Sequence, residues 1–381
     1  MTTERQITER QITERQQEWI ATMQGHAGEH GLVLAHRDGP PPSVTPRPAH
    51  RVAREELEES TLAPGATRSC GAGDRARPEE PDPLRTCFER DRDRILHSTA
   101  FRRLAGKTQV FVFPADHQRT RLTHALEVAQ VATAVSRAVG LNVALTEAIA
   151  LGHDCGHGPG GHASEDAFDR FVPGGYHHAV WGADVVLSSL NLCRETLDGI
   201  RNHSWSLPTP ATPEGVVVSW ADRCAYSAHD LEDAASAGVV DPRELPPAVT
   251  RVLGSTRRRQ LSTLIAALID GIETTGVVGM PAPFADALSA LREFNYDRIY
   301  DRRASVRQGE AVVAVLSALV EHFAEHPVAS GDDRSAFEPD PVGAAVTYVA
   351  GMTDRFAFDT AVRLLDWPVE RLPRGFDSPR R

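Results

Sequence analysis

The sequence predicts an all-α protein. Apolar residues recur at spacings of three and four in successive segments between residues 120 and 365, which is the period of one helix face. Residues that start and stop helices stand at the ends of these segments: Thr212 and Pro213 precede one, and Gly140 follows another. Runs that alternate apolar and polar residues, as β-strands do, are scarce. These observations favour helices packed on helices.

The first 81 residues are expected to be poorly structured. Residues 3–17 repeat the word TERQI with a period of five, which fits neither a helix nor a coiled-coil heptad. Residues 38–50 and 64–83 are rich in proline or glycine, as linkers and turns are. We therefore place the folded part in a core at 82–240 and a helical C-terminal part at 241–381 packed on that core.

The helices of the folded part are expected in the following order. Residues 120–140 carry apolar residues on nearly every face, which predicts a buried helix, and 141–154 continues the spacing into a histidine-rich stretch. A long helix is expected over 212–238, because a threonine and a proline stand at its start and a glycine at its end. Further helical segments are expected at 256–276, 284–300, 309–323 and 343–365.

The composition excludes several classes of protein. With 381 residues, of which 41% are hydrophobic and 24% charged, the chain can bury a sizeable core. The net charge of -11 argues against nucleic acid as a partner. No apolar run approaches the roughly 18 residues that span a bilayer, and the N-terminus has no signal-peptide core, so we expect no membrane association. Five cysteines without a CxxC pair indicate reduced thiols and a cytoplasmic protein.

Histidines gather in one part of the sequence. Six of the 16 lie between residues 124 and 178, and the stretch LGHDCGHGPGGHASEDAF (151–168) combines histidines with acids and glycines. A lone buried histidine such as His124 is most often a hydrogen-bonded core residue. The adjacent His153 and Asp154 are different, because imidazole and carboxylate together suit a divalent cation and a buried carboxylate is costly unless it is paired or coordinated. The pattern predicts a metal site that receives a fourth ligand from a distant helix.

The helix expected at 212–238 offers that ligand. At about 100° per residue, the side chains of Asp222, Tyr226, Asp230 and Arg223 project at about 0°, 40°, 80° and 100°. One face of the helix therefore carries two acids, a phenol and a guanidinium. This combination favours the wall of an active site over a solvated helix face.

Five longer sequence words resemble the dGTPase-like proteins, which are the deoxynucleoside triphosphate triphosphohydrolase branch of the HD-domain phosphohydrolases. The words are RDRDRILHSTAFRRLAGKTQVF (90–111), RLTHALEVAQ (121–130), HDCGHGPGGH (153–162), ADRCAYSAHDLEDA (221–234) and GMTDRFAFD (351–359). They occur in that family's order and cover about 85–360 of the chain. The resemblance implies an HD-domain helical bundle with additional C-terminal helices.

The same resemblance assigns roles residue by residue. It implies a cation held by His124, His153, Asp154 and Asp222. The catalytic positions of the family are matched by His157, His162 and Glu165. Of these, His162 would exchange protons with the attacking or leaving oxygen under the influence of Glu165. Positions that contact the substrate are matched by Arg121, His178, Arg223, Tyr226 and Asp230.

The reaction that the resemblance implies is metal-dependent hydrolysis of a deoxynucleoside triphosphate to a deoxynucleoside and tripolyphosphate. The mixed donors favour Mn or Mg as the cofactor, with Fe, Co or Zn as alternatives, and members of the family commonly form homo-oligomers. Two other functions stay open. The protein could be another HD-type phosphohydrolase, such as a 5′-nucleotidase or a cyclic-nucleotide phosphodiesterase. Such an enzyme would use the same four ligands but would have no reason to carry the sequence words at 90–111 and 221–234. A catalytically silent nucleotide-sensing protein should lack a ligand or the pair of His162 and Glu165, and all of these are present.

Overall fold

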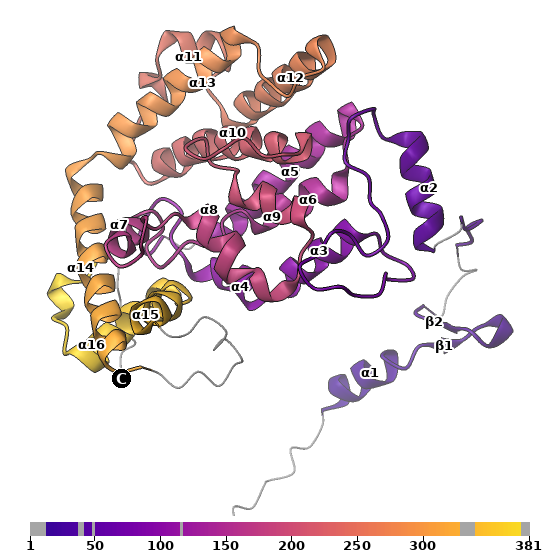
Figure 1. Cartoon of the computed structure of the whole chain (residues 1–381), viewed down its shortest axis with the longest axis horizontal. Helices are drawn as coiled ribbons and strands as arrows, with labels where there is room; N and C mark the ends of the chain where they lie inside the picture. The colour runs from indigo at the N-terminus through magenta and orange to yellow at the C-terminus, as the bar shows by residue number, and fades with distance from the viewer. Residues whose placement is uncertain (1–12, 37–41, 48–49, 115–116, 328–339, 375–381) are drawn as a thin grey trace, which may run out of the picture. The chain divides into compact units, whose positions relative to one another are not determined.

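The fold is described from a computed structural model of the chain (Figure 1). The chain divides into two compact units, Met1–Ala49 and His50–Arg381. The residues that the structure describes are 13–36, 42–47, 50–114, 117–327 and 340–374.

The described residues of the first unit form one α-helix, a short 3-10 helix and one small sheet. Helix α1 (Glu14–Thr22) is followed by strands β1 (His26–Ala27) and β2 (Val33–Leu34), which pair antiparallel. Most of the TERQI repeat lies outside the described residues. Its last copy starts α1, because the side chains of Thr13 and Gln16 form a capping box around the first turn. All residues of α1 are exposed, so this helix adds no core.

Residues 50–81 are more ordered than the sequence predicted. The second compact unit begins at His50, and helix α2 (Arg51–Thr61) opens it. The segment after α2 is held by polar contacts: the buried side chain of Arg75, for example, forms a 2.6 Å ion pair with Asp91. Such contacts leave no apolar periodicity in a sequence, which is why the composition of this segment predicted little structure.

The second unit is built from helices, which confirms the predicted all-α class. After α2 its helices are α3 (Cys87–His97), α4 (Thr99–Arg103), α5 (Arg121–Val139), α6 (Val143–Gly152), α7 (Ala163–Asp169), α8 (His178–Trp181), α9 (Arg194–Arg201), α10 (Pro213–Ser236), α11 (Pro247–Val252), α12 (Arg257–Thr275), α13 (Ala282–Asn295), α14 (Arg303–Glu325), α15 (Pro341–Ala350) and α16 (Asp354–Leu365). Among the described residues, β1 and β2 are the only strands. None of the described helices combines the length and the apolar character that a membrane crossing requires.

The long helices lie where the sequence predicted them. The segments expected at 120–140 and 212–238 form α5 and α10, each shifted by no more than two residues at either end. The segment at 343–365 contains two helices, because Thr353 caps a new helix by accepting a hydrogen bond from the amide of Phe356 at 3.4 Å.

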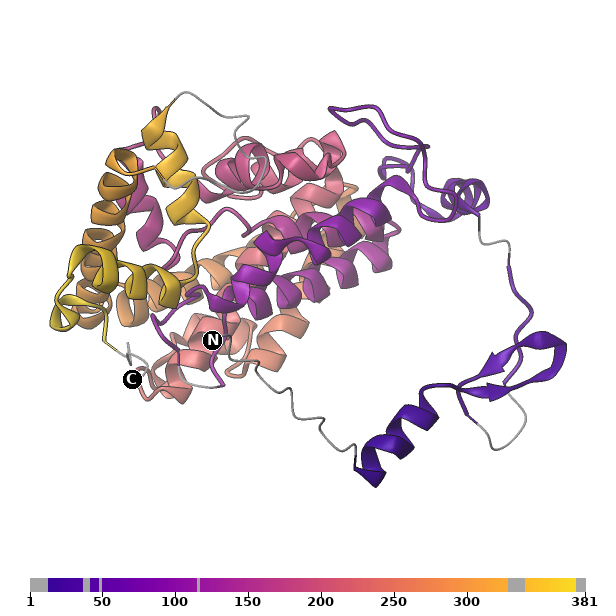
Figure 2. The same ribbon diagram turned by 90° about the horizontal axis from the view of Figure 1, so that it is seen from below.

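Three apolar clusters hold the second unit together. The largest cluster lies among α3, α5, α6 and α10. Helix α5 is buried on most of its faces, which explains why its sequence is apolar on nearly every face. A second cluster joins α7 to α14, α15 and α16, and a third joins α10 to α11, α12 and α13. Figures 1 and 2 show the C-terminal helices α14–α16 beside α7, and α11–α13 beside α10.

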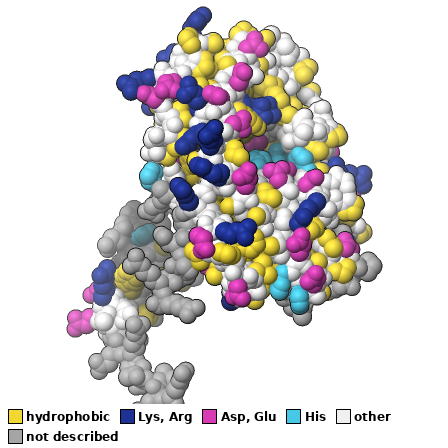
Figure 3. All heavy atoms as spheres, turned by 90° about the vertical axis from the view of Figure 1, so that its left-hand side faces the viewer, with side chains coloured by type: hydrophobic (Ala, Val, Ile, Leu, Met, Phe, Trp, Pro, Cys, Tyr) yellow, Lys and Arg dark blue, Asp and Glu magenta, His cyan; other side chains and the backbone are white. Residues whose placement is uncertain are grey.

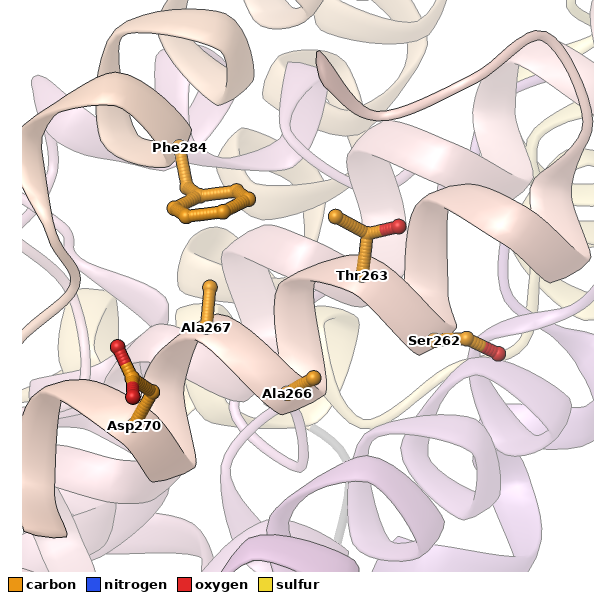
Figure 4. Close-up of a pocket in the computed structure, with 6 residues that line it drawn as sticks. All are labelled: Ser262, Thr263, Ala266, Ala267, Asp270 and Phe284. Atoms are coloured by element: carbon orange, nitrogen blue, oxygen red, sulfur yellow. The ribbon is translucent and has the colours of Figure 1, made fainter.

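A recess between α12 and α13 carries none of the residues assigned a role from the sequence. Its lining is Ser262, Thr263, Ala266, Ala267, Asp270 and Phe284 (Figure 4). These side chains are small or apolar apart from a single acid. The recess offers no group of donors for a cation or a phosphate, and the histidine-rich site lies elsewhere.

Candidate active site

Three helices bring the predicted metal-binding residues into one space. Helix α5 carries His124, α6 runs at its C-terminal end into His153 and Asp154, and α10 carries Asp222. His124 and Asp222 are 98 residues apart in the sequence, yet their side chains are in contact. The contact arises because α5 packs against both α6 and α10.

The donor atoms of these four residues lie close together. Nε2 of His124 is 3.0 Å from Oδ1 of Asp222 and 3.9 Å from Oδ2 of Asp154. Nε2 of His153 is 3.5 Å from Oδ1 of Asp154 and 3.7 Å from Oδ1 of Asp222. A cation bound at about 2.1 Å by each donor needs donors roughly 3–4 Å apart. The donors form two overlapping groups that share His153: His124, His153 and Asp154 in one, and His153, His203 and Asp222 in the other.

The histidine at the centre of the cluster is oriented to coordinate. The Nδ1–H of His153 donates to the carbonyl oxygen of Ala150 at 2.6 Å, so in the neutral ring the lone pair on Nε2 faces the carboxylates. This Nε2 atom is buried and has no hydrogen-bond partner in the described structure. A buried polar atom without a partner is destabilising, and a metal ion would satisfy it. The nitrogen and oxygen donors present fit a divalent cation.

Both carboxyl groups of the cluster are held in their charged form. Burial would raise the pKa of Asp154, but the neighbouring His153 and Arg121 outweigh burial and lower that pKa well below its ordinary value. Burial also opposes ionisation of Asp222, whose pKa is lowered by its hydrogen bond with His124 and by the nearby His153. Since a carboxyl group binds a metal as carboxylate, both side chains are ready to coordinate.

The side chain of Arg121 is buried beside the four residues of the predicted metal site. Its side chain is 1% exposed, and Nη1 donates to Oδ2 of Asp154 at 2.7 Å. Its Nε and Nη2 atoms have no hydrogen-bond partner among the described residues. Gly161, at a φ of +65°, permits this placement, because a Cβ atom there would lie 2.8 Å from Nη2. The unused N–H groups of the guanidinium suit the oxygens of a phosphate.

A second group of side chains surrounds Glu165 on α7. Its Oε1 accepts hydrogen bonds from Nδ1 of His162 at 3.2 Å and from Nδ1 of His178 at 2.7 Å. Nε2 of His157 lies 3.6 Å from the same oxygen. Burial would raise the pKa of Glu165, but the hydrogen bonds from His162 and His178 lower it far below its ordinary value. The structure therefore gathers three imidazoles around one carboxylate.

His162 differs from the other two imidazoles in its exposure. Its side chain is 75% exposed, whereas those of His157 and His178 are buried. Figure 3 shows histidine side chains at a hollow on one face of the molecule, with acidic side chains close by. A ring that a carboxylate holds, and that also reaches solvent, can exchange protons with a group bound in the hollow.

His203 also joins the site, although the sequence analysis did not single it out. Its Nδ1–H donates to the carbonyl oxygen of Ile200 at 2.8 Å, and its Nε2 lies 3.2 Å from Nε2 of His178. With His153 and Asp222 it forms a further group of possible metal donors. Burial lowers its pKa to about 3, so the ring is neutral. One signal was available: His203 is the last histidine before Asp222 in the sequence.

Two other residues of α10 are in contact with neighbouring rings and charges. The guanidinium of Arg223 lies 3.5 Å from the ring centroid of Trp205. The hydroxyl of Tyr226 accepts a hydrogen bond from Nε of Arg292 at 2.7 Å. Their predicted contacts with a substrate stay predictions.

Both carboxylate oxygens of Asp230 have partners within the protein, and its predicted contact with a substrate stays a prediction. One of its carboxylate oxygens forms an ion pair with Arg119, and the other accepts a hydrogen bond from the hydroxyl of Tyr300. Arg119 also pairs with Asp233, one turn further along α10, at 2.7 Å. The spacing of residues along a helix predicts which side chains point the same way. It does not show which of these side chains already pair with a neighbouring segment.

Two known families match this chain. The HD domain matches residues 121–227, which include the four members of the metal cluster, and the phosphohydrolase-associated domain matches residues 278–363.

Proteins similar to most of the chain carry the name deoxyguanosinetriphosphate triphosphohydrolase-like protein. One from Caldanaerobacter subterraneus subsp. tengcongensis is 40% identical over 316 residues, which cover 81% of this chain and 93% of the relative. One from Desulfatibacillum aliphaticivorans is 40% identical over 337 residues, which cover 80% and 94%. Among solved structures, a phosphohydrolase from Bacteroides thetaiotaomicron is 16% identical, with a TM-score of 0.45 over 71% of this chain and 69% of that one.

Proposed function

Because this chain belongs to the deoxyguanosinetriphosphate triphosphohydrolase-like family of HD-domain phosphohydrolases, we propose that it hydrolyses deoxynucleoside triphosphates to deoxynucleosides and tripolyphosphate. The observation that carries the proposal is the placement of Arg121. Two of its buried donors have no partner among the described residues and lie beside the cluster of metal donors. This combination of a cation site and an unused guanidinium suits a substrate that brings several phosphate oxygens.

The cation would be held by His124, His153, Asp154 and Asp222, and Mn or Mg suits these donors, with Fe, Co or Zn as alternatives. When bound, it would polarise a phosphoryl oxygen and lower the pKa of a water molecule. Asp154 would also act on the substrate indirectly, because its hydrogen bond to Nη1 fixes the plane of the Arg121 guanidinium. The free edge of that plane, with Nε and Nη2, would then bind the phosphate chain.

We assign the proton transfers of the reaction to the side chains around Glu165. Water attacks the α-phosphorus, the bond from phosphorus to the 5′-oxygen breaks, and the 5′-oxygen takes up a proton. His162 is the group we assign to this exchange, because its ring is exposed and its Nδ1–H is held by Glu165. His157 and His178, whose rings stack with centroids 3.8 Å apart, would form the buried wall that faces the phosphates.

The proposal is tested by product identification in water labelled with ¹⁸O, with each of the four common dNTPs and with Mn or Mg added. We expect tripolyphosphate that carries the label and a deoxynucleoside that does not, because attack at phosphorus leaves the nucleoside oxygen untouched. Asp222→Ala protein serves as the control for a contaminating phosphatase. Orthophosphate or pyrophosphate as the first product would contradict the proposal and favour another HD-type phosphohydrolase. Tight dNTP binding without turnover would favour a nucleotide-sensing protein.

A further inference from the structure

Two buried charged side chains near the site take no part in the chemistry proposed above. Lys107 is 3% exposed and follows α4, and Asp354 is 4% exposed and is the first residue of α16. They are 247 residues apart in the sequence, in the parts that precede and follow the helices of the metal cluster. A buried charge is destabilising unless polar groups compensate it, so the partners of these two side chains are informative.

The carboxylate of Asp354 binds two segments at once. Its Oδ1 accepts a hydrogen bond from the amide of Gly160 at 2.8 Å. Its Oδ2 accepts from the amide and from the hydroxyl of Thr108, at 3.0 and 2.5 Å. Thr108 in turn forms an antiparallel bridge with Thr120, the residue before α5. The carboxylate therefore links the loop after α6 to the start of the helix that carries Arg121.

The ammonium group of Lys107 binds the same loop from its other end. Nζ donates to the carbonyl oxygen of His157 and, at 3.0 Å, to the carbonyl oxygen of Ala350 at the end of α15. The backbone of Lys107 adds a third link, because its carbonyl oxygen accepts from the amide of Arg121 at 3.3 Å. Lys107 and Asp354 thus hold the loop 157–160 at both ends.

The sequence of this loop permits many backbone conformations. Glycines at 156, 158, 160 and 161 leave its backbone with wide conformational freedom. Gly160 and Gly161 both have positive φ values, and a Cβ atom at Gly160 would lie 2.4 Å from a methyl group of Val312 on α14. Hydrogen bonds to other residues therefore help to select one conformation: the carbonyl oxygen of His157 accepts from Lys107, and the amides of Gly158 and Gly160 donate to Ser164 and Asp354.

We propose that Lys107 and Asp354 are positioning residues, which clamp the glycine-rich loop to the C-terminal helices and thereby place His157 and His162 for catalysis. This inference rests on the proposed function, because it assumes that His157 and His162 act in the hydrolysis of the deoxynucleoside triphosphate. It also gives a specific role to the part of the chain that the phosphohydrolase-associated domain matches, because α15 and α16 supply the Ala350 carbonyl and the Asp354 carboxylate that hold the loop.

The test compares Asp354→Asn with Asp359→Asn on the same helix. Asp359 is half-buried and has no hydrogen bond or ion pair in the described part of the chain, so it is a matched control. We expect Asp354→Asn to lower kcat by about 10- to 100-fold, since a misplacement of about 1 Å can cost that much. KM should change less than kcat and metal content should stay normal, because the substitution leaves the side chains of Arg121 and of the metal donors in place. Thr108→Val should give a smaller loss of kcat, and Thr108→Ser should restore most of it.

Amide hydrogen exchange gives a readout that does not depend on activity. In Asp354→Asn, exchange at Gly160 and its neighbours should speed up about tenfold or more, while exchange in α5 and α10 stays unchanged. If kcat per bound metal and loop exchange both match the Asp359→Asn control, the clamp proposal is wrong, whatever happens to the melting temperature. If the wild-type protein releases no tripolyphosphate, the proposed function is wrong, and the exchange data still decide whether the clamp holds the loop.

Discussion

Glu165→Gln tests the arrangement in which one carboxylate holds two rings. Glutamine keeps the shape of the side chain and an acceptor oxygen, but it removes the negative charge that faces His162 and His178. Because the pKa of Glu165 lies far below its ordinary value, the wild-type side chain is charged at any pH suited to an assay. The substitution therefore changes the charge at every such pH.

The size of the effect follows from the two hydrogen bonds. A hydrogen bond to a charged group contributes about 1.5–3 kcal/mol and a neutral one about 0.5–1.5, so each loses roughly 1–1.5 kcal/mol when the charge is removed. Two bonds give about 2–3 kcal/mol, which corresponds to a decrease in kcat of about 30- to 150-fold if the full effect appears in the transition state. We expect the loss in kcat, with metal content unchanged, because Glu165 is not one of the four residues proposed to hold the cation.

The double variant His162→Ala/Glu165→Gln makes the test sharper. If Glu165 acted only through His162, the double variant would be no worse than His162→Ala alone. Because the shorter hydrogen bond goes to His178, at 2.7 Å, we expect a further loss of at least about fivefold. The assay is single-turnover hydrolysis at saturating dNTP, with metal content measured on the same preparation. Asp166→Asn, at the exposed next position of α7, is the control. A double variant equal to His162→Ala would refute the two-ring reasoning.

Four further outcomes are expected. His162→Ala should lower kcat by about 10²–10⁴-fold with KM and metal content nearly unchanged, and normal single-turnover rates per bound metal would contradict its role in proton transfer. Asp222→Ala should lower metal content together with activity while the fold survives, and elemental analysis checks this. Asp91→Asn should destabilise the protein by about 1.5–3 kcal/mol in urea unfolding, because it removes one of the two carboxylates that pair with the buried Arg75 guanidinium and leaves only that of Glu79. Burial lowers the pKa of His229 to about 3, so this ring binds a proton on unfolding at any pH between about 3 and 6.5. Stability should therefore fall by at most about 1.4 kcal/mol per pH unit on acidification in this range, and His229→Gln should reduce that slope.

The long helices and the residue types that could bind a metal could be predicted from the sequence, because both are local properties. Helix α5 shows its burial through apolar residues on nearly every face, and the adjacent His153 and Asp154 indicate a possible metal site through their chemistry. The segment 50–81 was missed for the converse reason. Its order depends on partners far away in the chain, such as Asp91 for Arg75, and no periodicity records them.

The sequence by itself determined that this is an all-α protein with histidines and aspartates suited to a divalent cation, because helical period and residue chemistry can both be read from the order of the residues. Only the tertiary structure decided which side chains share that site. It placed His203 beside His178, directed Asp230 to Arg119, and brought Asp354 to the loop at Gly160. These distances depend on how helices far apart in the chain cross and pack. The crossing is settled by the fit of whole apolar faces and not by any short stretch of sequence.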